Sequence, residues 1–453
     1  MKSIFLDDPK SNFKPFVIIL FLLLFVYGFW LSVFWPGVLG EDSYSILLEV
    51  ENPGIHNSGK PAFWLYFVRI FYENSRLAEL PIAALLTVAA VVFARIIGWC
   101  WSERLFKTAL FCFIFICLAP HLIFFMGNLY PDGVYSACVA GLLFEIWLVA
   151  TKRRASASNL AMLAITIPFA AFARPNGIVF LAPVAILLFF TVKSSRIWIA
   201  AILIGWCSIM AFATANQGSR GHGALYPLVI FETVNFLQPR PMNLWTASPR
   251  VSALTIETLK KHKPIDNYLK FYDPDYWDPL QFQPEGPRAL TFPREDQKII
   301  VREFFTYNLW RNIPKFLASR VNIFMVSAFA QGGIPSFEYA EHVLKILHTN
   351  SSYRKFALSK SEEVLKKIHE ASYNTRMLFW TPFLGIGLLI WSLVIGIREG
   401  DAALLIICTP MAVQLIAIFA FSIAGEYRYL LPFFTLPLVL LPAWATRRAT
   451  IPN

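Results

Sequence analysis

The hydrophobic positions of this chain gather into long runs that short polar joints separate. A window of about 19 residues, the length that crosses the hydrocarbon core of a bilayer, selects ten such runs. They lie at residues 15–35, 81–99, 108–126, 134–151, 157–172, 177–192, 197–214, 378–397, 402–421 and 429–446. The pattern predicts an all-α polytopic membrane protein with about ten transmembrane helices, two of them short.

The seventh and eighth runs are separated by a long polar stretch. We therefore expect three parts: an N-terminal membrane domain at 1–215, a helical, loop-rich extracytoplasmic region at 216–376, and C-terminal membrane helices at 377–453. Within the polar stretch, residues 321–330 are apolar, but the segment is too short for an ordinary span. An interfacial helix near 315–330 is expected, although a span there would invert the last three helices.

Another amphipathic segment lies in the first outer loop, which we place at residues 36–80. Residues 61–71 are apolar, with Arg69 in their middle. This stretch is too short and too charged to cross a bilayer, so we expect a helix on the membrane surface.

Composition and charge agree with a membrane protein. The chain has 453 residues, of which 57% are hydrophobic, and carries a net charge of +11. Its basic residues lie largely in short clusters at alternate joints, so the positive-inside rule places both termini in the cytoplasm and disfavours nucleic acid as a partner. No small-residue cleavage site follows the first run, so we expect it to be retained as a membrane helix rather than cleaved as a signal peptide. These features are typical of the bacterial cytoplasmic (inner) membrane.

The polar motifs then fall together on the extracytoplasmic side. The foremost is the acidic pair Glu41 and Asp42, just past the end of the first run. Carboxylates are costly near hydrocarbon, so such a pair is more readily explained by chemistry than by packing. The six cysteines lie in or at the ends of apolar runs without a CxxC spacing, which indicates neither disulfides nor a metal site.

In their order along the chain, these motifs resemble the integral-membrane glycosyltransferases of the GT-C superfamily, which use polyprenyl-phosphate-linked sugars. The motifs are Glu41-Asp42, His56 with Pro61, Asp132 after Tyr130-Pro131, Arg174-Pro175, and Arg428-Tyr429. The polar region resembles poorly characterised bacterial members through the patch 272–279 and the later set Trp310, Pro314 and Arg320.

The resemblance implies an inverting transfer of a sugar from a polyprenyl-phosphate donor to a cell-envelope glycan or glycolipid acceptor. Asp42 or Glu41 would be the general base, because a carboxylate can take the proton of an acceptor hydroxyl. Asp132 would orient the acceptor or assist the base. The cations Arg174, Arg428 and Lys60 would hold the donor phosphate.

Other candidates are His56 and Tyr429, and a membrane lipid surface is implied as a partner. No cofactor is required by the motifs, although a divalent metal (Mg²⁺ or Mn²⁺) held by Asp42, Asp132 and His56 is conceivable.

Simpler roles remain open for each site residue. Glu41, Asp42 and Asp132 suit helix N-termini, while Arg174 suits an anchor at lipid headgroups. Arg428 could pair with Glu426. The glycines around His222 are a weak phosphate-binding signal, and Asp273, Asp275 and Asp278 a weak calcium-loop signal.

Three other functions also stay open. An envelope glycan polymerase or ligase would use an oligosaccharide donor, and a transporter or flippase would carry ionisable residues within its spans. A scaffold or assembly protein for envelope synthesis would tolerate changes of the outer acidic and basic residues without loss of activity.

Overall fold

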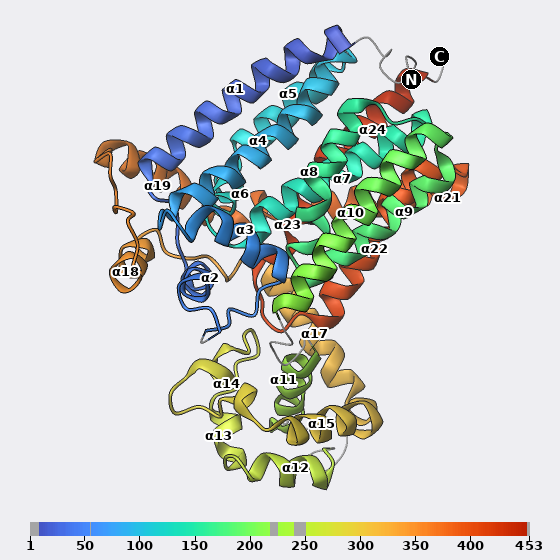
Figure 1. Cartoon of the computed structure of the whole chain (residues 1–453). Helices are drawn as coiled ribbons and strands as arrows, with labels where there is room; N and C mark the ends of the chain where they lie inside the picture. The colour runs from blue at the N-terminus through green and yellow to red at the C-terminus, as the bar shows by residue number, and fades with distance from the viewer. Residues whose placement is uncertain (1–8, 55, 218–224, 240–250, 451–453) are drawn as a thin grey trace. The chain divides into compact units, whose positions relative to one another are not determined.

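The computed structural model describes residues 9–54, 56–217, 225–239 and 251–450, and groups them into two compact units (Figure 1). The membrane unit comprises Met1–Arg220, Ile334–Gln414 and Arg428–Asn453. The small unit comprises Gly221–Gly333 and Leu415–Tyr427. Apart from isolated β-bridges, the regular elements of the described residues are helices, as the hydropathy pattern predicts.

Seven helical segments among the described residues are long and apolar enough to cross a membrane. They contain α1 (Pro9–Val33), α4 (Glu79–Ser102), α7 (Pro131–Lys152), α10 (Lys193–Gln217), α20 (Arg376–Phe379) with α21 (Phe383–Glu399), α22 (Ala402–Phe421), and the series η4 (Tyr427–Leu430), α23 (Leu431–Thr435) and α24 (Pro437–Thr450). Each coincides with one of the expected apolar runs. The chain thus has the helices of a polytopic membrane protein.

The three other apolar runs form shorter helices. α5 (Phe106–Cys117) and α6 (Pro120–Met126) meet at a bend of 67°, where Pro120 opens the second helix. A proline has no backbone N–H to continue the preceding hydrogen-bond ladder, which accounts for a break at this point. α8 (Ala157–Phe172), and η1 (Pro175–Phe180) with α9 (Leu181–Phe190), are below the usual length of a span. Counting the bent pair as one span gives eight candidates rather than ten.

α7 is the central helix of the membrane unit. It packs against α4, α8, α23 and α24, and 94% of its apolar window is buried. Gly133 permits the approach of α6, because a Cβ there would lie 2.4 Å from the backbone carbonyl carbon of Phe125. Since the first turn of α7 is fixed on several sides, its polar residues are held in place.

Two short helices occupy the loop between α1 and α4: α2 (Glu41–Glu51) and α3 (Ala62–Tyr72). α3 is the helix expected at 61–71, and it buries Trp64, Val68 and Tyr72 while Ile70 is exposed. After residue 334 the chain adds α18 (Tyr339–Ile346) and α19 (Ser359–Asn374) to the membrane unit. Backbone hydrogen bonds from Asn350 and Arg354 tie this segment to the α1–α4 loop.

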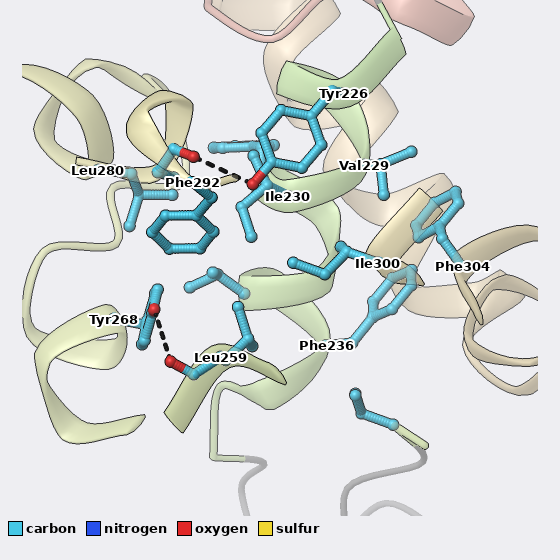
Figure 2. Close-up of a cluster of buried hydrophobic side chains, with 14 of the residues drawn as sticks. Tyr226, Val229, Ile230, Phe236, Leu259, Tyr268, Leu280, Phe292, Ile300 and Phe304 are labelled. Atoms are coloured by element: carbon cyan, nitrogen blue, oxygen red, sulfur yellow. Dashed lines mark hydrogen bonds between the residues drawn. The ribbon is translucent and has the colours of Figure 1, made fainter. Parts of the chain in front are cut away.

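The small unit has a hydrophobic core of its own (Figure 2). Its helices are α11 (Leu225–Leu237), α12 (Ala253–Lys260), α13 (Ile265–Lys270), α14 (Asp278–Phe282), η2 (Ala289–Thr291), α15 (Arg294–Glu303), the π-helical turn η3 (Phe304–Asn308), α16 (Leu309–Arg311) and α17 (Ile313–Ala328). Ile230, Phe292 and Ile300 meet in the core, and the Tyr268 hydroxyl donates to the carbonyl of Leu259. α17 includes residues 321–328 of the apolar segment 321–330 and, at 16 residues, is not among the candidate spans.

A buried ion pair links two helices of the small unit. Arg320 of α17 pairs with Glu232 of α11, and neither side chain is exposed. Ser319 and Asn235 add hydrogen bonds to the same carboxylate. Arg320, which the sequence singled out as part of a motif, thus joins α17 to α11.

Candidate functional site

Two carboxylates begin helices at one end of the membrane unit. Asp42 lies in the first turn of α2 and Asp132 in the first turn of α7, where the helix dipole favours negative charge. Neither accepts a side-chain capping hydrogen bond, since the N-cap residues are Gly40 and Tyr130. Capping therefore does not account for these acids.

Three cations join the carboxylates in a row of alternating charge. Asp42 Oδ2 lies 2.7 Å from Lys60 Nζ and also pairs with Arg428. Arg428 Nη1 lies 3.9 Å from Asp132 Oδ2, and Asp132 pairs with Arg174 at its other oxygen. We call Lys60, Asp42, Arg428, Asp132 and Arg174 the charge chain. With all five groups ionised, its net charge is +1 (three cations less two carboxylates).

The charge chain is partly open to solvent. The Asp132 side chain is 1% exposed, whereas those of Lys60, Asp42, Arg428 and Arg174 are 13–25% exposed. Asp132 is thus the buried member of the charge chain, and the other four groups are accessible to a ligand.

The ion pairs also set the protonation of the accessible groups. Burial alone would raise the pKa of Asp42, but the adjacent Lys60 and Arg428 hold that pKa well below its ordinary value. Burial lowers the pKa of Lys60, and the Asp42 carboxylate opposes that effect. Asp42 is therefore a weak base for as long as both cations bind it.

Two tyrosine rings hold the guanidinium groups in place. The Tyr429 ring lies 4.8 Å from the Arg174 guanidinium carbon and 5.6 Å from that of Arg428, while Tyr130 lies 4.6 Å from Arg428. Such contacts restrain a cation without neutralising it. The sequence indicated Tyr429 as a candidate but not Tyr130, whose position directly before the Pro131-Asp132 turn was the available signal.

Glu41 and His56 lie outside the charge chain. Glu41 is exposed and forms no ion pair with the residues that the structure describes. The His56 ring shares a hydrogen bond of 3.0 Å with Ser45, within the α2–α3 segment. The structure brings together six of the eight residues named from the sequence and leaves these two apart.

The residues present do not fit a divalent metal. Across the described ranges, no three His, Cys, Asp or Glu side chains converge on one point. Asp42 and Asp132 face cations instead, and His56 turns to Ser45. A metal ion would have to displace those cations, so no catalytic step is assigned to one.

The weaker sequence signals do not form sites among the described residues. His222 lies outside the residues that the structure describes. Asp273 accepts the backbone N–H of Asp275, whose own carboxylate accepts from Asn322. The six cysteines are free thiols.

Comparison of the chain with protein-family models, with curated proteins and with solved structures gives no match. The fold and site together define a helical membrane protein with an ordered row of charges where several of its helices begin.

Proposed function

We propose that the charge chain is the active site of an integral-membrane glycosyltransferase. The enzyme would move a sugar from a polyprenyl-phosphate-linked donor to a cell-envelope glycan or glycolipid on the extracytoplasmic face. The observation that carries this proposal is the alternation of three cations with two carboxylates where several helices of the membrane unit begin. Lipid-phosphate sugar transfer needs both kinds of group close together.

The cations match the donor phosphate. A polyprenyl phosphosugar is a phosphodiester with a single negative charge, and the net charge of +1 on the charge chain would balance it. Arg174 and Arg428 offer planar guanidinium groups suited to phosphate oxygens, and Lys60 adds a compact charge. Their tyrosine contacts orient the guanidinium groups before the donor arrives.

The transfer step follows from these positions. A carboxylate takes the proton of the acceptor hydroxyl while the hydroxyl oxygen attacks the anomeric carbon of the donor sugar. The bond from that carbon to the phosphate oxygen breaks at the same time. The bonding electrons remain on the departing polyprenyl phosphate, which gains one negative charge. Arg174 and Arg428 stabilise that developing charge, the main electrostatic contribution to lowering the barrier.

Donor binding and base strength are linked at Asp42. Its carboxylate and the donor phosphate would compete for Lys60 and Arg428. When the phosphate draws these cations away, Asp42 loses part of the ion pairing that holds its pKa low, and it becomes a stronger base. Asp42 is thus activated only in the loaded site, and the exposed Glu41 is the alternative base.

An apolar surface for the polyprenyl tail begins beside Lys60. The half-buried rings of Phe63 and Phe67 on α3 contact Phe169, and Phe63 also contacts Trp206. These rings offer the tail an aromatic surface that begins three residues after Lys60 along the chain.

A direct test is transfer of radiolabelled sugar from polyprenyl-phosphate sugars in membranes that contain the protein. Asp42→Asn and Arg174→Ala should each lower the transfer rate at least about a hundredfold, the usual effect of losing a general base or a charge-stabilising donor. Arg69→Gln is the matched control, because Arg69 pairs with Glu73 on the surface of α3. It should transfer at the wild-type rate.

Either of two results would count against the assignment. Unchanged transfer by both variants would remove the charge chain from the chemistry. Absence of transfer by the wild type across the common sugars would favour an oligosaccharide donor, as in a glycan polymerase or ligase, or a transporter.

A further inference from the structure

A second polar site lies at the other end of the same helices. A cavity of about 400 Å³ opens between the last turns of α7 and α24, the end of α9 and the joint between α21 and α22. α7 has 22 residues, so at a rise of about 1.5 Å per residue its last turn lies some 30 Å from Asp132 in its first. The cavity is therefore separate from the charge chain and does not depend on the proposed function.

The lining of the cavity is amphipathic. Trp147, Phe190 and Ile406 form an apolar part, and Arg153, Asp401 and Arg447 form a polar part. Phe190 is 39% exposed, so the apolar part reaches the outer surface of the helices. Apolar and basic groups meet in this way where acyl chains join headgroups at the ends of membrane spans.

Of the two arginines that line the cavity, Arg153 is the one whose positive charge can serve an anionic ligand. Arg447 already pairs with Glu399 and Asp401. Arg153, by contrast, forms no ion pair with the residues that the structure describes, and it is flanked by the exposed Lys152 and Arg154. The entrance is therefore positively charged.

The backbone of Arg153 is held in a fixed position. Its φ of 52° ends α7 in the left-handed conformation, and its carbonyl accepts the N–H of Val192. The side chain therefore starts from a defined point at the rim of the cavity.

We propose that this cavity binds the headgroup of an anionic phospholipid. Its phosphodiester would contact Arg153, and its acyl chains would leave over Phe190 and Ile406. Basic pockets between transmembrane helices select anionic headgroups in this manner. A zwitterionic phospholipid has no net charge and should bind more weakly, while a soluble glycerol phosphate lacks the chains that the apolar wall accepts.

The test uses the purified full-length protein and short-chain lipids. Phosphatidylglycerol, phosphatidylcholine and soluble glycerol phosphate are titrated in parallel, and bound ligand is counted by native mass spectrometry. Phosphatidylglycerol should bind more tightly than both. Arg153→Gln should weaken its binding about tenfold, the size of one charge-assisted hydrogen bond.

Arg104→Gln is the matched control, since Arg104 is also exposed with a positive φ just after a long helix but does not line the cavity. It should bind phosphatidylglycerol as the wild type does. Ala403→Leu narrows the cavity without changing charge and should also weaken binding. Any of three results would overturn the proposal. The two lipids could bind equally well, the two arginine variants could have equal effects, or glycerol phosphate could bind as tightly as phosphatidylglycerol.

Discussion

At the scale of single residues, Gly40 determines how closely two parts of the charge chain approach. A Cβ at this position would lie 2.3 Å from the Tyr130 hydroxyl oxygen and 2.9 Å from Pro335 Cβ. Tyr130 contacts Arg428, and Gly40 caps the helix that carries Asp42. A side chain at residue 40 would therefore shift the carboxylate relative to its cation.

We predict that Gly40→Ala lowers sugar transfer at least about tenfold while the protein still folds, because small misplacements of reacting groups are costly. Gly28→Ala is the control. Nothing lies within 4 Å of the Cβ it would add, so transfer should be unchanged and α1 slightly stabilised. Equal transfer by both variants would show that the spacing at Gly40 does not matter.

His369 of α19 makes stability depend on pH. It lies among Phe124, Phe337 and Trp380, and burial lowers its pKa to about 4. In the unfolded chain a histidine takes up its proton near pH 6.5. The unfolded state therefore binds more protons between about pH 6.5 and 4, and stability falls as the pH decreases through that window.

The thermal midpoint of the wild type should accordingly drop between pH 7 and pH 5, and His369→Gln should drop less. His342→Gln changes an exposed histidine and should keep the wild-type slope. The comparison is of slopes, so a general loss of stability in His369→Gln does not affect it. Parallel slopes for all three proteins would contradict this role of His369.

The residue types of the charge chain are easier to recognise in the sequence than the partners of each residue. Asp42, Asp132 and Arg174 were recognisable because charged groups next to long apolar runs require an explanation. Asp42 pairs with Arg428, which lies 386 positions later in the chain. This pairing depends on the packing of α2 near the start of the last span, which the sequence does not indicate. The contact of the Tyr130 ring with Arg428 likewise depends on a fold that brings distant turns together.

At the scale of elements, α7 carries a second ion pair inside the membrane unit. Glu145 is fully buried, and its carboxylate accepts hydrogen bonds from Arg95 of α4 at 2.8 Å and from Asn159 of α8 at 2.6 Å. Its hydrogen bonds join three helices, so we interpret it as structural rather than as part of a transport pathway.

Arg95→Met should destabilise the protein by about 3–5 kcal/mol, because it leaves the Glu145 carboxylate buried without its cation. Arg69→Ala removes an exposed pair on α3 and should cost less than about 1 kcal/mol. Thermal unfolding in detergent measures both. A transporter would instead need Glu145 for substrate passage. Full sugar transfer by a folded Glu145→Gln variant would therefore support the structural interpretation of Glu145 over the transport pathway.

The helices were largely predictable from hydropathy, because a bilayer requires every backbone polar group in a span to be bonded within a helix. All ten apolar runs are helical. The number of spans was less predictable. The bend before Pro120 is a local break that a hydropathy window averages over. The length of α8, by contrast, matches the short apolar run at 157–172.

At the scale of the whole molecule, the chain leaves the membrane unit for the small unit and returns. The hydropathy pattern outlined the polar stretch, but it did not indicate that Leu415–Tyr427 groups with the small unit. Backbone bridges of Tyr276 with Ala424 and of Gly332 with Glu426 join this segment to the rest of the small unit. Such contacts leave no periodic signal in a sequence.

In the proposed function, the cations of the charge chain hold a lipid phosphate in competition with Asp42. This competition can be tested by measuring the binding of polyprenyl phosphate, without a sugar, to wild type, Asp42→Asn and Lys60→Met. Asp42→Asn should bind the lipid about three- to tenfold more tightly, since it removes the carboxylate that competes for Lys60 and Arg428, and yet transfer no sugar. Lys60→Met should bind more weakly, and Arg69→Gln should match the wild type. Unchanged or weaker binding by Asp42→Asn, or unchanged binding by Lys60→Met, would contradict this competition for the cations.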